Sequence, residues 1–239
     1  MIKDLKDIKK NEINLFGGKA VNLGFLIQNG FNVPAGFCIS TKINELTSTV
    51  KKETIKRFRA LNSKVSVRSS ATAEDAKNAS FAGQFDTFLN IDSDVRVLNA
   101  IKNCWTSVKS GRVNSYMEGK KIKNIEMAII IQKMVNADFA GVIFTVNPIK
   151  KKGLLIEVTE GLGDKLVSGE VTPNTYFIDK KSLKIINNIL KFSFKKSLIT
   201  KLSQTALEIE KLYKFPQDIE FCIKNEKIFI LQSRPITTL

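Results

Sequence analysis

Short strand-like segments recur along most of the 239-residue chain, and only a few long amphipathic segments separate them. The strand signal is an alternation of apolar and polar residues between turn-forming residues. The expected extended segments are residues 31–39, 65–68, 85–91, 127–132, 141–145, 154–159, 176–179, 218–223 and 228–234, and the expected helices are residues 19–29, 42–61, a segment after Asp92, and 198–213. Many strands, few long helices and no internal repeat predict an α+β domain with two lobes.

The helix after Asp92 is expected to face the core with a single apolar stripe. Asp92 is a suitable N-cap, because its side-chain oxygen can accept a bond from a backbone N–H of the first turn. The residues that helical spacing places on the stripe are Val95, Leu98, Ile101, Trp105 and Val108.

Charge and composition narrow the function classes. The net charge is +15, from 38 Lys and Arg against 23 Asp and Glu, which favours an anionic partner. Only six of these cations are arginine and the lysines are spread along the chain, so a lysine-rich surface is favoured over nucleic-acid binding. A small ligand that carries phosphate remains compatible. The chain has no histidine, which excludes Ser-His-Asp and Cys-His nucleophile systems and any phosphohistidine within these residues.

The cysteines and the apolar runs predict a cytoplasmic protein that does not enter a membrane. There are three cysteines, far apart and with no CxxC pair, so neither a disulfide framework nor a zinc site is expected. The first ten residues are charged rather than apolar, unlike a signal peptide. The apolar run at residues 128–131 is too short to span a bilayer.

A Gly17-Gly18-Lys19 sequence opens the first expected helix. Glycines let backbone N–H groups approach a phosphate, the N-terminus of a helix favours negative charge, and the lysine adds a cation. By itself the signal is weak, since a glycine pair before a helix is usually only a cap. The full GxxxxGK[ST] P-loop is absent from the sequence, which disfavours a Walker-type NTPase.

A second candidate site follows the strand at residues 65–68. Arg68 stands at the end of this strand, and hydroxyl residues and a Phe-Ala-Gly turn come after it. A guanidinium beside hydroxyls suits an anion cradle. On composition alone, an ordinary serine-rich surface loop is the more common interpretation.

The closing hairpin carries a third candidate site. Two acids, Asp218 and Glu220, alternate with apolar residues on one strand, and Gln232 and Arg234 do so on the next. Facing each other, these side chains would provide oxygen ligands for magnesium beside a phosphate clamp. The alternative is a hairpin whose outer face is simply polar.

The register of this hairpin decides whether Glu220 and Gln232 can share a metal. Residues directly opposite in an antiparallel pair point to the same face. We expect Glu220 opposite Gln232, which also sets Lys224 opposite Ile228 and leaves a three-residue turn at residues 225–227. A two-residue turn at 225–226 would instead set Glu220 against Leu231 unless a bulge compensates.

Five blocks of the sequence together resemble one family. They are GGKAVNLGFLIQNGFNVPAGF, VSVRSSATAEDAKNASFAGQFDTFLNI, MAIIIQKMVNADFAGVIFTVNP, EGLGDKLVSGEVTPNTYFIDK and PQDIEFCIKNEKIFILQSRPIT. In this order they resemble the ATP-grasp nucleotide-binding domain of phosphoenolpyruvate synthase, pyruvate phosphate dikinase and the rifampicin phosphotransferases. The resemblance implies a two-lobed ATP-grasp fold with antiparallel or mixed sheets. It implies a single domain over residues 1–239, with approximate lobes 1–126 and 127–239.

The resemblance also implies a role for each candidate residue. Lys19 and Arg68 would contact the ATP phosphates, and a loop with Gly83 and Thr87 would cover them. Gln132 would lie at the adenine end, where the backbone of Lys133 to Val135 could read the base. On the closing hairpin, Glu220 and Gln232 would hold Mg²⁺ and Arg234 would stabilise the phosphoryl group in transfer, with Arg68 and Arg234 as the catalytic pair.

Enzymes of this family pass a phosphoryl group to a histidine on a separate swivelling domain, which carries it to pyruvate or another acceptor. These residues contain no histidine and end where that domain would begin. The resemblance therefore predicts an Mg-ATP-dependent phosphotransferase, incomplete without a histidine-bearing partner domain or subunit. The alternatives are a catalytically silent nucleotide-binding or regulatory module and the ATP-binding half of an antibiotic phosphotransferase.

Overall fold

The computed structural model describes residues 1–72, 86–107, 125–163, 166 and 169–236, and it divides the chain into two compact units. Unit 1 consists of Met1–Gly30 and Pro34–Met134, and unit 2 of Phe31–Val33 and Val135–Leu239. In its described part, no helix is long and apolar enough to cross a membrane.

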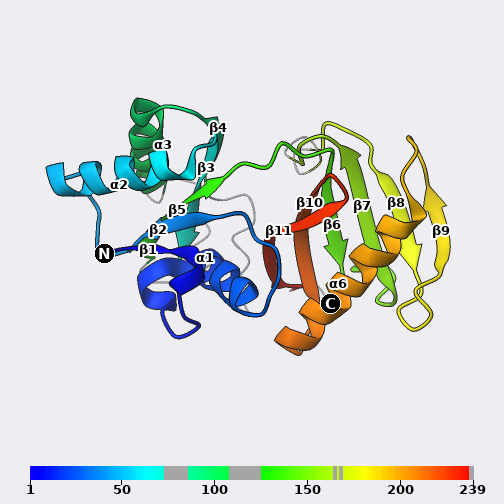
Figure 1. The fold of residues 1–239 in the computed structure, drawn as a ribbon. Coiled ribbons are helices and arrows are strands. Elements are labelled where there is room, and N and C mark those ends of the chain that lie inside the picture. The colour runs from blue at the N-terminus through cyan, green and yellow to red at the C-terminus, as the bar shows by residue number, and fades with distance from the viewer. Residues whose placement is uncertain (73–85, 108–124, 164–165, 167–168, 237–239) are drawn as a thin grey trace. The chain divides into compact units, whose positions relative to one another are not determined.

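Unit 1 is built on an antiparallel five-stranded sheet (Figure 1). Its strands are β1 (Ile2–Asp4), β2 (Gly36–Ile39), β3 (Val65–Ala71), β4 (Thr87–Ile91) and β5 (Met127–Lys133). Their spatial order is β1-β2-β5-β3-β4. Its helices are the short 3-10 helix η1 (Leu5–Asp7), α1 (Ile13–Gln28), α2 (Ser48–Leu61) and α3 (Asp94–Ser107). Because β5 pairs with β2 and β3, the first unit extends to Met134, eight residues beyond the approximate lobe boundary expected after residue 126.

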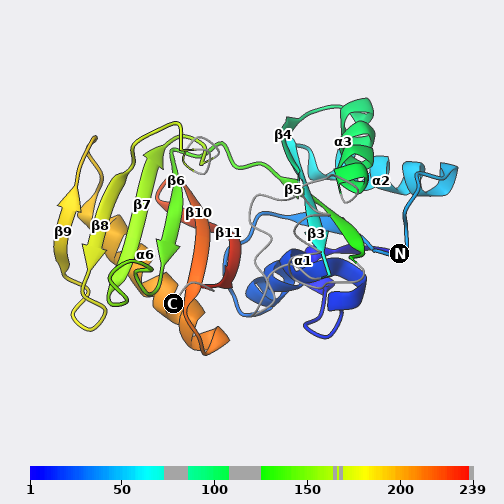
Figure 2. The ribbon, with the colours of Figure 1, turned by 180° about the vertical axis from the view of Figure 1, so that it is seen from behind.

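The two faces of this sheet have different partners. Alternate residues of β3 and β5, among them Val65, Val67, Ile129 and Ile131, join α2 and α3 in one hydrophobic core. The opposite face carries Ser66, Arg68 and Ser70, and α1 packs there against β3 and β5. Figures 1 and 2 show α1 on one side of the sheet and α2 with α3 on the other.

Helix α3 forms as expected, but the residues that it buries differ in part from the predicted apolar stripe. Its buried residues are Val97, Ala100, Ile101, Cys104 and Ser107. The predicted stripe is only partly right: Ile101 is buried and Trp105 packs against the core, but Val95 is 67% exposed, and Val108 lies outside the described residues. The cap is Ser93, which accepts from Arg96 N at 3.4 Å, and Asp92 pairs with the Arg96 guanidinium instead.

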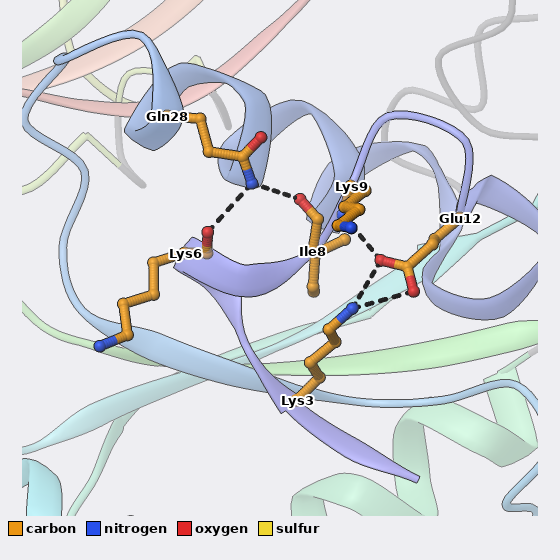
Figure 3. A network of polar contacts seen from close by, with 6 residues as sticks. All are labelled: Lys3, Lys6, Ile8, Lys9, Glu12 and Gln28. Carbon is orange, nitrogen blue, oxygen red and sulfur yellow. Dashed lines mark hydrogen bonds and ion pairs between the residues drawn. The ribbon is translucent and has the colours of Figure 1, made fainter.

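The N-terminal segment ties α1 to the rest of unit 1. The polar network involves Lys3, Lys6, Ile8, Lys9, Glu12 and Gln28 (Figure 3). The Glu12 carboxylate accepts from Lys3 Nζ at 2.8 Å and from Lys9 N at 2.7 Å. At the other end of the helix, Gln28 Nε2 donates to the Lys6 and Ile8 carbonyls at 3.0 and 2.9 Å. Both ends of α1 are thus held to residues 3–9.

Unit 2 is a second antiparallel sheet covered by one long helix. Its strands are β6 (Phe139–Phe144), β7 (Leu154–Glu160), β8 (Asn174–Ile178), β9 (Ile185–Ile189), β10 (Gln217–Lys224) and β11 (Lys227–Pro235), and the helix is α6 (Lys196–Tyr213). The strand order is β11-β10-β6-β7-β8-β9, with every pairing antiparallel. Helix α6 crosses in front of the sheet in Figure 1 and behind it in Figure 2, so it covers one face.

The two faces of this second sheet also differ. Ile219 and Phe221 on β10 share a face with Ile143 on β6 and Ile156 on β7, and all four are at most 1% exposed. The opposite face carries Asp218, Glu220 and Glu157, of which the two glutamates are only partly buried. We conclude that α6 packs on the isoleucine face and that the acidic side chains lie on the other.

Candidate functional site

In unit 1, the predicted glycine motif forms a kink in α1. Gly17 has φ 73° and ψ 168°, a backbone conformation that is essentially restricted to glycine. It lies directly against β3: a Cβ at this position would be 2.2 Å from the Ser70 carbonyl oxygen. The regular helix therefore begins after Gly17, close to the predicted start at Lys19.

The kink brings Lys19 to the strand that carries Arg68. Lys19 Nζ donates to the Ser69 carbonyl at 3.3 Å, next in sequence to Arg68. Thr87, expected in the loop over the phosphates, is instead the first residue of β4 and pairs with Arg68, so three of the four residues expected at the phosphates lie within one unit. The fourth, Gly83, lies outside the described residues.

Gln132 is the last but one residue of β5, just before the chain passes from unit 1 into unit 2. Its side chain is 2% exposed, and Nε2 donates to the Pro34 carbonyl at 3.0 Å. The next two N–H groups are also used inside unit 1: Lys133 N donates to Ala35 O and Met134 N to Lys64 O, each at 2.8 Å. The predicted hydrogen bonds between this backbone and a base are therefore limited to the Val135 N–H and to carbonyl groups.

In unit 2, the hairpin of β10 and β11 sets Glu220 opposite Gln232 and Asp218 opposite Arg234, which confirms the predicted pairing at this end. The predicted three-residue turn is wrong. Lys224 pairs with Lys227, which leaves Asn225 and Glu226 as a two-residue turn in which both residues have positive φ. Such turns match the right-handed twist of the strands.

A bulge reconciles the turn with the site. The register shifts between Glu220 and Phe221, because Phe221 faces Ile230 while Glu220 faces Gln232. Leu231 is thus the extra residue, and the strand twists past it. With no bulge, Glu220 would face Leu231 and could not share a metal with Gln232.

An ion pair holds the arginine of the hairpin. Arg234 donates through both Nε and Nη2 to Asp218 Oδ2, at 2.9 and 2.7 Å. The Asp218 side chain is 10% exposed. Burial raises its pKa, Arg234 acts in the opposite direction, and the nearby Glu220 adds to the rise. The pair therefore fixes the guanidinium on the face of the sheet that also carries Glu220 and Gln232.

The donor set of this face suits magnesium. In the described part of the chain, no group of three or more His, Cys, Asp or Glu residues is placed to hold a metal. The opposed pair instead offers a carboxylate from Glu220 and an amide oxygen from Gln232. Magnesium prefers hard oxygen ligands, is usually bound through one or two carboxylates, and keeps several waters, so these residues fit it.

The sequence analysis did not find Glu157. Glu220 pairs with Val142 and Val142 with Glu157, so this second glutamate lies on the same face as Glu220, two strands or about 10 Å away. Burial raises the pKa of the Glu157 carboxyl. The strand alternation of residues 154–159 could have placed Glu157 on a face, but only the strand order puts that face beside the hairpin.

The sequence matches a family model and several known proteins. The sequence profile described as pyruvate phosphate dikinase, AMP/ATP-binding domain, matches residues 42–191 and 187–239. A probable phosphoenolpyruvate synthase of Archaeoglobus fulgidus is 34% identical, over 98% of this chain and 41% of that protein. A rifampicin phosphotransferase of Bacillus cereus is 31% identical, over 100% of this chain and 36% of that protein. The chain thus spans less than half the length of these relatives.

The fold comparison is consistent with the sequence comparisons. A dinucleotide-forming acetyl-coenzyme A synthetase 1 of Ca. Korarchaeum cryptofilum superposes with a TM-score of 0.52 at 10% identity, over 90% of each chain. This likeness concerns the fold alone, and it confirms the predicted ATP-grasp class. The matched profile and the two relatives establish that the chain belongs to the family of pyruvate phosphate dikinase AMP/ATP-binding domains, which includes phosphoenolpyruvate synthases and rifampicin phosphotransferases.

Proposed function

We propose that the chain binds Mg-ATP and passes a phosphoryl group from it to a histidine outside these 239 residues. The observation that carries the proposal is the closing hairpin. There, an opposed carboxylate and amide (Glu220 and Gln232) share a sheet face with an arginine held by two bonds to Asp218. Phosphoryl transfer depends on positioning and charge neutralisation more than on covalent chemistry by the protein, and these side chains supply both.

Each candidate residue, in unit 1 and on the closing hairpin, has a distinct role in the proposal. Lys19 and Arg68 neutralise phosphate oxygens, and Glu220 and Gln232 hold the magnesium ion. When bound, this ion neutralises charge on the phosphates. Arg234 binds the phosphoryl group as it leaves the nucleotide, and Asp218 keeps the guanidinium from turning away. Backbone at Val135 contacts the adenine edge.

The acceptor is proposed from the family and from the composition. The sequence contains no histidine, so a phosphohistidine carrier has to lie outside it. The names of the two relatives point to different final acceptors, pyruvate chemistry in one and rifampicin in the other. We propose a shared first step, ATP to histidine, and leave the final acceptor to the carrier domain.

The first expected result is stabilisation by nucleotide. Mg-ATP at 100 times its dissociation constant is expected to stabilise the protein against unfolding by about 2.7 kcal/mol, because the ligand binds only the folded state. Thermal or chemical unfolding with and without Mg-ATP measures this. Lys181→Ala, which removes an exposed cation outside the candidate sites, is expected to keep the full shift, and Glu220→Gln to lose most of it. No shift at millimolar Mg-ATP would contradict nucleotide binding.

The second expected result concerns transfer. The chain alone is expected not to phosphorylate pyruvate. Addition of a histidine-bearing domain from the phosphoenolpyruvate synthase family is expected to yield an acid-labile, base-stable label on that domain. Separate reactions with ATP labelled at the β- or the γ-phosphate would identify the phosphoryl group that moves. If Mg-ATP binds but neither label moves, the chain is a silent nucleotide-binding module instead.

A further inference from the structure

The hydroxyl of Ser70 joins strand β3 to the kink of helix α1. Ser70 Oγ donates to the Phe16 carbonyl at 2.8 Å and accepts from Ala20 N at 3.1 Å, and the residue is fully buried. The two partners stand on either side of Gly17, at which the helical dihedral angles are interrupted. One hydroxyl therefore closes the gap that the kink opens in the backbone bonding of the helix.

This arrangement is a helix cap provided by another strand. Since Gly17 is the non-helical residue, Ala20 is the third residue of the helical segment that follows. Its N–H is one that an N-cap side chain usually satisfies. Gly17 has no side chain, and any Cβ there would lie 2.5 Å from Ser70 Oγ. The glycine thus admits the serine, and the serine replaces the missing cap.

The same serine connects the helix and the strand that carry the candidate phosphate-binding cations Lys19 and Arg68. Arg68 and Ser70 are alternate residues of β3, so they point to the same face about 7 Å apart along the strand. Lys19 is directly before Ala20, whose N–H Ser70 binds, and its ammonium reaches the Ser69 carbonyl. The two buried hydrogen bonds of the Ser70 hydroxyl therefore help to hold the helix that carries Lys19 to the strand that carries Arg68.

We propose that Ser70 is a positioning residue for phosphate binding: its hydroxyl sets Lys19 and Arg68 at the spacing that the polyphosphate of ATP requires. This inference rests on the function proposed above and deepens it. Ser70 itself touches no phosphate, so its loss acts through the two cations. The effect is confined to ligands that carry phosphate, because the base and the sugar do not meet Lys19 or Arg68.

The strand offers a matched control in Ser66. It lies on the same face of β3 as Ser70 and is also buried, but its hydroxyl donates to the Gln132 carbonyl of β5 at 3.4 Å rather than to α1. Ser66→Ala removes a buried hydroxyl from the same strand without releasing the helix. Any loss of stability that comes simply from removing a buried hydroxyl of β3 is therefore present in both variants.

The test is isothermal titration of ATP and adenosine into the wild-type protein, Ser70→Ala and Ser66→Ala. We expect Ser70→Ala to weaken ATP about tenfold, the scale of one lost hydrogen bond. Adenosine should bind it as it binds the wild-type protein, and Ser66→Ala should change neither affinity. If Ser70→Ala fails to fold, Ser70→Cys keeps the side-chain volume with a weak hydrogen-bonding group, and the same selective loss is expected.

Two results would overturn the proposal while leaving the proposed function intact. One is an equal loss for ATP and adenosine in Ser70→Ala, which would make the role merely structural. The other is unchanged ATP affinity in both Ser70 variants. Failure of the wild-type protein to bind ATP would overturn the proposed function and this role with it, and the wild-type titration alone identifies that case.

Discussion

Replacement of Gly17 by alanine is expected to destabilise unit 1 by roughly 3–5 kcal/mol. Two costs combine. The backbone at φ 73° and ψ 168° is strained for any L side chain, and the new Cβ would lie 2.2 Å from the Ser70 carbonyl oxygen. That oxygen belongs to a central pair of strands and cannot move without breaking β3 away from β5. Denaturant unfolding of the wild-type and variant proteins measures the difference.

Gly30 is the matched control for this prediction. It also has a positive φ, +84°, but no heavy atom lies within 4 Å of where its Cβ would be. Gly30→Ala is therefore expected to cost only the conformational term, about 1–2 kcal/mol. Equal losses in the two variants would show that strain alone acts at Gly17 and that the contact with Ser70 contributes nothing.

The other large effect is expected at Arg234. Under the proposed function, Arg234→Ala should slow phosphoryl transfer to the histidine domain by about 10³-fold, the scale on which a transition-state arginine contributes. ATP affinity should change much less, since Lys19 and Arg68 still bind phosphate. Single-turnover transfer of label from ATP measures the rate, and a separate titration measures the affinity.

Arg59 provides the control for Arg234. It makes a similar pair with Asp94, through Nε at 3.3 Å and Nη2 at 2.5 Å, but its side chain is 71% exposed. Arg59→Ala removes an arginine–aspartate pair of the same kind at an exposed position of unit 1, so transfer should proceed at the wild-type rate. A transfer rate in Arg234→Ala within tenfold of wild type would rule out a role in the chemical step.

The sequence predicted the parts of this structure that local pattern controls. Alternation placed Glu220 opposite Gln232, because a one-residue slip would turn the buried isoleucine face of β10 outward. The alternation did not predict the turn. Asn225 and Glu226 both adopt positive φ there, a conformation that the twist of the paired strands favours. The bulge at Leu231, which reconciles the two, has no local signal.

Tertiary packing decided what the sequence could not. The stripe of α3 depends on how the helix is rotated against its sheet, which buries Val97 and leaves Val95 exposed although the two side chains are the same. Strands β1 and β9 were missed, because one has three residues and the other, Ile-Ile-Asn-Asn-Ile, does not alternate. Ser70 is one of the hydroxyl residues after Arg68 that the sequence assigned to a loop. Its contacts with Phe16 and Ala20 join residues 50 or more positions apart, which no local pattern predicts. The roles of the site residues stay predictions.

The bulge at Leu231 divides the closing hairpin into two segments that have different pairing registers. On the turn side, opposed residue numbers sum to 451, and on the site side they sum to 452. The segment that carries Glu220 and Gln232 has contacts of its own: Ser233 Oγ donates to Gln217 Oε1 at 2.7 Å, and β10 pairs with β6. Its register therefore does not depend on the turn. Lengthening the turn by one residue while deleting Leu231 would therefore leave Glu220 facing Gln232. The turn end of this hairpin can therefore change in length without altering the geometry of the end that carries Glu220 and Gln232.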